Sequence, residues 1–395
     1  INKRLNDSSL RVIPACSVQG RCSGCPLMIL QPQAQLQMKR ELVQEALIKY
    51  AGLPRGRVQP VTASPLPLGY RNQCKLPIRQ EHGQLVSGLY EEGSNRIIPI
   101  HSCLIHDEHL EALRKQIMGL LNKFKLSAYD PKTETGLRTL VLRYLDGQFQ
   151  CVLVTGKSLL PSGLIEELKQ IPGLVCLMQN INPDKRSRQL FSSRWKLLAG
   201  EDRLPVQLGR LQLNLSCASF FQLNRPQAYQ LYQKAASLIK PCTTLVEAYS
   251  GIGGISLMLK DKAKTIIGIE SIQEAVDNAN ENARLNQADH VRFVCGDAAK
   301  EMKKISRKRK IDAVVVDPPR TGLDGAMIES LRQCQPEQIV YISCNPATLG
   351  KNIKELKDLY EVKTVIPFDM FPNTAHVETI VLLSKLKTKK HVNKL

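Results

Sequence analysis

The sequence predicts an α/β protein, with a doubly wound sheet in its carboxyl-terminal part and a β-rich region before it. From residue 243 onward, short apolar runs alternate with segments of helical length. The last two runs leave no room for a helix between them, so they must pair as an antiparallel hairpin. In the middle of the chain, Asp146-Gly147 separates two apolar runs and is a strong hairpin signal. The strands predicted for the sheet are Thr244–Tyr249, Thr265–Ile269, Val291–Val294, Ile311–Val316, Gln338–Cys344, Lys363–Phe368 and Val377–Ser384.

The composition is that of a globular protein with a strongly basic charge balance. The 395 residues include 55 Lys and Arg against 36 Asp and Glu, a net charge of +19. This charge favours nucleic acid as a partner, and a basic surface without such a partner is the alternative. Because the sequence contains neither an apolar run of 18 residues nor a signal peptide, we expect no membrane span and a cytoplasmic protein. No obligate protein partner is evident, so we expect a monomer. Twelve cysteines in such a chain indicate metal or catalytic roles rather than disulfides.

A group of cysteines near the start of the chain is the first candidate site. Cys16, Cys22 and Cys25 have a C-x5-C-x2-C spacing, and Cys103 follows a predicted strand as a candidate fourth ligand. Three clustered cysteines with one distant cysteine are common in iron–sulfur ligation, whereas zinc sites more often use two close pairs. An iron–sulfur cluster, a structural zinc ion and unligated thiols therefore stay open from the spacing. Three histidines nearby are interpreted as surface or loop residues: His101, His106 and His109.

A glycine-rich loop follows the first strand of the carboxyl-terminal sheet. In Ser250-Gly251-Ile252-Gly253-Gly254 the backbone can approach a ligand closely, and Glu270 ends the next strand, where a carboxylate can accept hydrogen bonds from ribose hydroxyls. NAD-dependent enzymes share this pattern. Asp297, at the end of the third strand, is interpreted either as a contact to the adenine side of the ligand or as a helix N-cap. The antiparallel end of the sheet favours an S-adenosylmethionine-dependent methyltransferase.

Three further polar residues stand at strand ends of the same sheet. Asp317 ends the fourth strand, and the two prolines that follow it hold the loop extended. Cys344 ends the fifth strand beside a predicted helix N-terminus, which favours a thiolate; a buried structural cysteine is the alternative. Glu378 stands at the beginning of the last, otherwise apolar strand, either as a functional carboxylate or as an edge charge.

Taken together, these motifs resemble the RNA uracil-C5 methyltransferases. Within that family the chain is most similar to the iron–sulfur branch that makes 5-methyluridine in 23S ribosomal RNA. The resemblance covers nearly the whole chain, and the Asp317 and Cys344 motifs are highly specific in this order. It is carried by the four cysteines and by the segments Ser219–Asn224, Tyr249–Gly253, Asp317–Arg320, Ser343–Pro346 and His376–Thr379.

The resemblance implies a reaction and a set of binding residues. Cys344 would attack C6 of the target uracil, C5 would take a methyl group from S-adenosylmethionine, and Glu378 would remove the C5 proton so that Cys344 is released. The implied cofactor-lining residues are Gln222, Tyr249, Gly251, Gly254, Glu270, Asp297 and Asp317. The implied ligands of a [4Fe–4S] cluster are Cys16, Cys22, Cys25 and Cys103.

The implied architecture is a Rossmann-like class I methyltransferase domain joined to an α+β, β-rich RNA-binding domain that carries the cluster. Residues 1–27 would form the cluster loop, and residues 28–58 a helix that packs on the catalytic domain. Residues 59–215 would form the central RNA-binding domain, which supplies Cys103, and residues 216–395 the catalytic domain. The target base would be flipped out of its stack to reach the site.

Some features depart from the family pattern. Glu247 and Ser250 stand where the family usually has Asp and Cys, and the amino-terminal RNA-binding β-barrel of larger ribosomal members is not seen after Ile1. The sequence therefore does not fix which uridine is modified, and the uridine of the transfer RNA T-loop is the alternative target. A non-catalytic RNA-binding or assembly factor and an NAD-dependent oxidoreductase are the rival functions.

Overall fold

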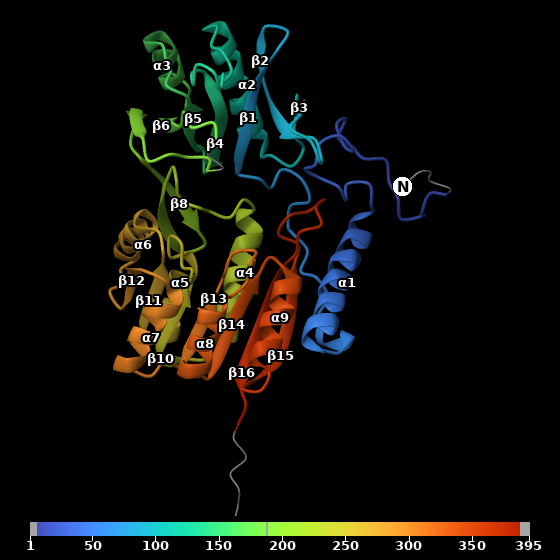
Figure 1. Ribbon diagram of the computed structural model, residues 1–395, viewed down its shortest axis with the longest axis vertical. Coiled ribbons are helices and arrows are strands. Elements are labelled where there is room, and N and C mark those ends of the chain that lie inside the picture. Colours follow the sequence, from blue (N-terminus) through green and yellow to red (C-terminus); the bar gives the residue numbers. More distant parts are fainter. Residues whose placement is uncertain (1–5, 187–188, 388–395) are drawn as a thin grey trace, which may run out of the picture. The chain divides into compact units, whose positions relative to one another are not determined.

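The computed structural model describes residues 6–186 and 189–387, and the chain divides into two compact units (Figure 1). Unit 1 comprises Ile1–Pro32, Pro65–Arg225 and Pro372–Thr374, and unit 2 comprises Gln33–Ser64, Pro226–Phe371 and Ala375–Leu395. Each unit therefore combines segments that lie far apart in the sequence. Among the described residues, no helix is both long and apolar enough to span a membrane.

Unit 2 is built on a mixed seven-stranded sheet with the order β12-β11-β10-β13-β14-β16-β15. The strands from β10 to β14 run parallel, and β16 is antiparallel to both of its neighbours, β14 and β15. The predicted seven strands and the antiparallel pairing of the last two are confirmed. The strands are β10 (Cys242–Ala248), β11 (Ala263–Glu270), β12 (Val291–Cys295), β13 (Ala313–Val316), β14 (Gln338–Ser343), β15 (Tyr360–Phe368) and β16 (Glu378–Lys385).

Helices bury the sheet of unit 2, which explains why its central strands are apolar throughout rather than alternating. They are α1 (Pro32–Ala51), η1 (Arg55–Arg57), α4 (Arg225–Leu238), α5 (Gly254–Met258), η2 (Lys260–Lys262), α6 (Gln273–Leu285), α7 (Ala298–Lys308), α8 (Gly325–Cys334) and α9 (Pro346–Leu356). Helix α1 joins this core from near the start of the chain and lies beside α9 (Figure 1), with Val43 and Leu47 fully buried. Gly350 permits this approach, because a Cβ there would lie 2.9 Å from Cβ of Tyr50.

Unit 1 contains a second seven-stranded sheet, with the order β3-β2-β1-β4-β5-β6-β7, and a separate two-stranded ribbon of β8 and β9. The strands are β1 (Gln73–Glu81), β2 (Gln84–Tyr90), β3 (Ile97–Pro99), β4 (Leu137–Leu145), β5 (Gln148–Thr155), β6 (Leu174–Ile181), β7 (Trp195–Gly200), β8 (Arg203–Leu208) and β9 (Leu211–Ser216). Helices α2 (Glu108–Lys123) and α3 (Ser162–Lys169) share an apolar core with this sheet. The predicted hairpin turn is confirmed, since Asp146 and Gly147 have φ values of 52° and 81°.

Candidate active site and cysteine group

Three neighbouring strands of the sheet in unit 2 begin or end side by side. Ser343, the last residue of β14, pairs with Thr379 of β16, and Phe368, the last residue of β15, pairs with Glu378. Cys344 follows Ser343 and therefore lies across from Glu378 on the neighbouring strand. Neighbouring strands are about 4.8 Å apart. The fold thus places the thiol and the carboxyl group side by side, although 33 residues of sequence separate them.

The residues after Cys344 and the loop after β13 are held together at the start of α9. Asn345 caps this helix by accepting a hydrogen bond from Ala347 N at 3.1 Å, and its Nδ2 donates to the carbonyl oxygen of Arg320 at 3.0 Å. The Oγ1 of Thr348 donates to the same carbonyl at 3.3 Å. These bonds fix the backbone of Arg320 next to the residue that follows Cys344.

Burial and neighbouring charges shift the pKa values of the groups at this edge. Burial, reinforced by the charge of Asp317, raises the pKa of Glu378 to about 8, and Arg320 opposes this shift. Burial also raises the pKa of Asp317 to about 7. The pKa of the Cys344 thiol is raised by burial and by the charges of Glu378 and Asp317, while Arg320 lowers it. Arg320 is therefore the cation that favours the ionised forms of both Cys344 and Glu378.

Arg320 also contacts a residue on the loop that leads to Glu378. Its guanidinium lies 3.1 Å from each ring nitrogen of His376, and both side chains are exposed. The sequence shows Arg320 within the Asp317 motif, yet Arg320 and His376 were not among the predicted site residues. Their contact joins two segments 56 positions apart, and no sequence spacing indicates it.

The glycine-rich loop has the backbone conformation that its glycines permit. Gly253 has a φ of 86°, and a Cβ there would lie 2.5 Å from Cζ of Phe293. Tyr249 also has a positive φ, 66°, which is uncommon for a residue with a side chain. The Oε2 of Glu270 accepts a hydrogen bond from Gly251 N at 3.1 Å, so the end of β11 holds this loop. Gly254 begins helix α5.

Glu247 and Ser250 are buried beneath this loop. Glu247 accepts hydrogen bonds from the backbone N, at 2.8 Å, and from the Oγ of Ser256 in α5, and burial raises its pKa to about 8. Among the described residues, the buried Oγ of Ser250 has no hydrogen-bond partner. An orphaned hydroxyl beside a tight glycine turn fits a loop that binds a polar ligand.

Asp297 and Gln222 have other contacts within their own units. Asp297 is exposed and caps α7, where its side chain accepts a hydrogen bond from Lys300 N at 2.9 Å, so it has the N-cap role that the sequence left as one alternative. Gln222 belongs to unit 1, where its backbone carbonyl accepts a hydrogen bond from Nδ2 of Asn72 at 3.0 Å. The structure therefore brings together Cys344, Glu378 and Asp317, and separately Gly251 and Glu270.

The four predicted ligand cysteines line one small cavity in unit 1, with a volume of about 30 Å³. Apolar side chains, among them Met28, Leu89 and Ile105, form much of the rest of its wall. Burial raises the pKa of Cys25 to about 12, and the charge of Arg71 acts in the opposite direction. Within residues 6–186 and 189–387, no group of three or more His, Cys, Asp or Glu side chains is arranged to hold a metal ion.

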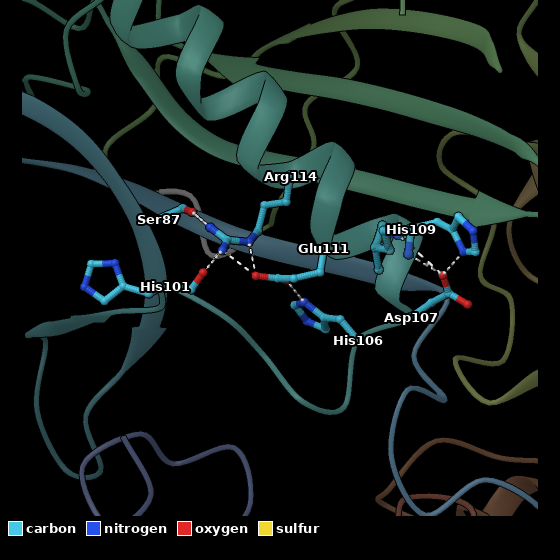
Figure 2. A network of polar contacts seen from close by, with 8 residues as sticks. Ser87, His101, His106, Asp107, His109, Glu111 and Arg114 are labelled. Carbon is cyan, nitrogen blue, oxygen red and sulfur yellow. Dashed lines mark hydrogen bonds and ion pairs between the residues drawn. The ribbon is translucent and has the colours of Figure 1, made fainter. Parts of the chain in front are cut away.

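Next to Cys103, a buried polar network corrects the interpretation of one histidine. His106 lies in the loop between β3 and α2, as one of the two predicted alternatives, but it is 5% exposed and not on the surface. Its Nδ1 lies 2.9 Å from Oε2 of Glu111 (Figure 2). Glu111 in turn pairs with Arg114, which donates to Oγ of Ser87 at 3.0 Å. Burial is the largest single influence and would raise the pKa of Cys103, but the hydrogen bond to His106, the charge of His106 and hydrogen bonds from the backbone together lower that pKa.

The chain is similar in sequence to known RNA methyltransferases. The sequence profile described as tRNA (Uracil-5-)-methyltransferase matches residues 199–386. A protein of Halalkalibacterium halodurans named as an uncharacterized RNA methyltransferase is 37% identical over 383 residues, which cover 94% of this chain and 83% of that protein. A Clostridium tetani protein with the same description is 37% identical over 403 residues, 99% of this chain and 87% of its own length.

Among solved structures, that of the Pyrococcus abyssi tRNA (uracil-54, C5)-methyltransferase in complex with S-adenosyl-L-homocysteine is similar to this chain. It is 25% identical, with a TM-score of 0.76, and the match covers 96% of this chain and 88% of that one. The mixed sheet of unit 2 is thus the fold of S-adenosylmethionine-dependent methyltransferases, and the NAD-dependent alternative is not supported. On its sequence relatives and its fold, the chain belongs to the RNA (uracil-5-)-methyltransferase family and is an S-adenosylmethionine-dependent enzyme.

Proposed function

We propose that this enzyme methylates C5 of a uridine in RNA through a temporary bond between Cys344 and C6 of the uracil. The observation that carries the proposal is the placement of Cys344 across from the buried Glu378, at the ends of β14 and β16. A nucleophile and a base with a pKa near neutrality are the two groups that this substitution needs.

The steps follow from the chemistry of the ring. The Cys344 thiolate adds to C6, and the electron pair of the C5–C6 double bond moves toward O4, which makes C5 nucleophilic. When bound, S-adenosylmethionine would supply the electrophilic methyl group. C5 would bond to this methyl group as its bond to sulfur breaks, and the electron pair of that bond would stay on the sulfur of S-adenosylhomocysteine, the leaving group. The Glu378 carboxylate then removes the proton from C5. The electrons of that C–H bond restore the double bond and expel the Cys344 thiolate, so the enzyme is regenerated.

The glycine-rich loop and the strand ends beside it are the proposed cofactor site. Positive φ values, the orphaned Ser250 hydroxyl and the carboxylate of Glu270 fit the binding of a ligand with ribose hydroxyls. Gly254, at the start of α5, would allow close backbone approach, and the half-buried Asp317 would face the cationic end of the cofactor. The remaining proposed contacts are Gln222, Tyr249, Gly251 and Asp297.

We propose 23S ribosomal RNA as the substrate, on the resemblance to the iron–sulfur branch, and the transfer RNA T-loop is the second candidate because a solved relative acts on uracil 54 of tRNA. Incubating the enzyme with labelled S-adenosylmethionine and separate unmodified transcripts tests both. Label at C5 of uridine in 23S transcripts alone is the expected result. Label in tRNA alone would replace the proposed target, and no label in either would contradict the proposed reaction. The cytoplasmic location and the monomeric state stay predictions.

We further propose that Cys16, Cys22, Cys25 and Cys103 hold a [4Fe–4S] cluster. Four thiols on one cavity with largely apolar walls are the donor set that such a cluster requires. A cluster of this kind binds its four thiolates to different iron atoms, so its ligands need not converge on one point as they do around zinc. The nearby charge of Arg71 would offset the negative charge of the bound cluster.

Anaerobic purification tests the cluster. We expect a brown protein with about four iron atoms per chain, and Cys25→Ser should lose the colour and most of the iron. Cys295→Ser is the control, since this cysteine is exposed at the end of β12 in unit 2 and should leave the iron content unchanged. A colourless protein that contains one zinc ion would show that the metal was assigned wrongly.

The charge of Arg320 should appear in the pH dependence of the reaction. Glu378 must be ionised to act as a base after methyl transfer, so the rate of adduct decay should fall as the pH is lowered below about 8. Arg320→Met removes the cation that lowers the pKa of Glu378 and Cys344, so this limb should move by about 0.5–1 unit toward alkaline pH. Arg332→Met, which removes an arginine paired with Asp358, is the control. A limb that stays in place or moves to lower pH would contradict this assignment.

A further inference from the structure

We propose that Lys39 of α1 is a positioning residue that holds Glu378 beside Cys344 by fixing the end of strand β15. The inference rests on the proposed function, because it concerns the step in which Glu378 removes the C5 proton. Lys39 would contact neither substrate nor cofactor. It would act through Asp369 and Phe371, which lie near the start of the connection between β15 and β16.

Lys39 is a fully buried lysine, with a relative exposure of 0%. Its Nζ donates hydrogen bonds to Oδ1 of Asp369 and, at 3.0 Å, to the carbonyl oxygen of Phe371. Burying an ammonium group is costly unless it is paired and hydrogen-bonded. The two bonds therefore restrain the chain at Asp369 and Phe371, since any movement of this segment away from α1 would leave a charge without a partner in the core.

The restrained segment lies next to the proposed base. Asp369 directly follows Phe368, and Phe368 is the register partner of Glu378 in the antiparallel pair of β15 and β16. Glu378 is in turn adjacent to Cys344 across the pair of β16 and β14. A displacement of the end of β15 would therefore be transmitted through one strand pair to the carboxyl group of Glu378.

The same strand end is held on its outer side by the segment after α1. Thr62 forms a bridge with Phe368, and Asp369 N donates to the carbonyl oxygen of Thr62 at 2.9 Å. The Nε2 of Gln227 in α4 donates to that carbonyl as well, also at 2.9 Å. The contacts made by α1 and by residues 58–62 thus converge on the two residues at which β15 ends.

A positional role fits the electrostatics better than a direct effect of charge. The charges that act on Glu378 are those of Asp317 and Arg320, whereas the charge of Lys39 acts on Asp369. A base must be within hydrogen-bond reach of the proton that it removes, and a misplacement of about 1 Å can reduce a rate about 10²-fold. Cys344 directly follows β14, which does not pair with β15, so its attack on C6 should be less sensitive to the loss of Lys39.

Lys39→Met and the double variant Lys39→Met/Asp369→Asn test this inference. The double variant leaves no unpaired charge in the core, which protects the experiment against a variant that fails to fold. Formation and decay of the covalent enzyme–RNA adduct are followed on denaturing gels with an unmodified substrate RNA and S-adenosylmethionine. We expect adduct formation within about twofold of the parent rate and decay about 10- to 100-fold slower in both variants, so that the adduct accumulates.

Val43→Ala is the matched control for a merely structural effect. Val43 lies one turn after Lys39 on the same helix and is fully buried, so its truncation loosens α1 without removing the two bonds of Lys39. This control should have a lower Tm and a parental rate of adduct decay. Parental decay in both Lys39 variants, or formation and decay slowed equally in them, would overturn the inference alone. Absence of an adduct in Glu378→Gln would overturn the proposed reaction and the inference with it.

Discussion

Cys344→Ala should abolish methyl transfer to RNA, with a loss in rate of about 10⁴-fold or more. Without the thiolate no bond forms at C6, and C5 of uracil is then too weak a nucleophile to take the methyl group. Transfer of labelled methyl groups into unmodified RNA measures the loss. Cys295→Ala is the control, since it removes an exposed thiol from the same unit. Residual methylation near the parental rate in Cys344→Ala would exclude the covalent route.

A trapping experiment separates loss of the nucleophile from loss of RNA binding. In transcripts that contain 5-fluorouridine, the fluorine at C5 cannot leave as a proton, so the adduct with the parent enzyme should be stable and visible as a slowly migrating band. Cys344→Ala should bind the same transcript with an unchanged Kd and form no such band. A band in the alanine variant would show that another group attacks the ring.

Glu378→Gln is expected to have the second largest effect, a fall in turnover of about 10²–10⁴-fold, which is the usual contribution of a positioned base. The glutamine amide cannot accept the C5 proton, whereas the attack of Cys344 and the transfer of the methyl group do not require it. The variant should therefore accumulate a covalent adduct with natural, unfluorinated RNA. Turnover at the parental rate would show that the C5 proton is removed by another group.

The same substitution should stabilise the folded protein at alkaline pH. The pKa of Glu378 is raised from 4.5 to about 8 by burial, so the folded state binds this proton more tightly than the unfolded state. The free energy of unfolding therefore falls as the pH rises from about 4.5 to 8. Glu378→Gln does not titrate and should avoid this loss, by on the order of 3 kcal/mol at pH 8.5 and by nothing near pH 4.

Glu247→Gln is the matched control for this pair of effects. Its carboxyl group is equally buried and also has a pKa of about 8, but it bonds to Ser256 beneath the glycine-rich loop and is not adjacent to Cys344. We expect a similar gain in Tm at alkaline pH without an accumulated adduct. Adducts in both variants would show that the effect comes from loss of buried charge rather than from loss of the base.

Much of the sheet in unit 2 was predictable because local patterns determine it. Each parallel strand is a short apolar run, and the length of the last connection forced an antiparallel pair. The hairpin at Asp146 and Gly147 was equally clear, since both residues need a positive φ. Helix α2 was not predicted, although Asp107 is a good N-cap and Leu110, Ile117 and Leu121 follow with helical spacing.

The contacts between distant side chains could not be predicted in the same way. The sequence predicts a surface or loop position for His106, because it does not show that Glu111 and Arg114 accompany this side chain into the core. Lys39 and Asp369 are 330 positions apart, and nothing local to either residue indicates an ion pair. Periodicity predicts which face of an element is buried, but it does not predict which polar groups meet there.

Three acidic residues of unit 2 with raised pKa values also affect the thermal stability of the folded enzyme. Glu247, Asp317 and Glu378 have pKa values of about 8, 7 and 8, and the charge of Asp317 acts on the other two. S-adenosylmethionine brings a sulfonium and an ammonium group, the positive charges that could offset these acids. The methyl donor should therefore act as a thermal protectant that is more effective than S-adenosylhomocysteine, which lacks the sulfonium charge. When the concentration of S-adenosylmethionine is low, a larger fraction of the enzyme should therefore be unfolded and open to proteolysis.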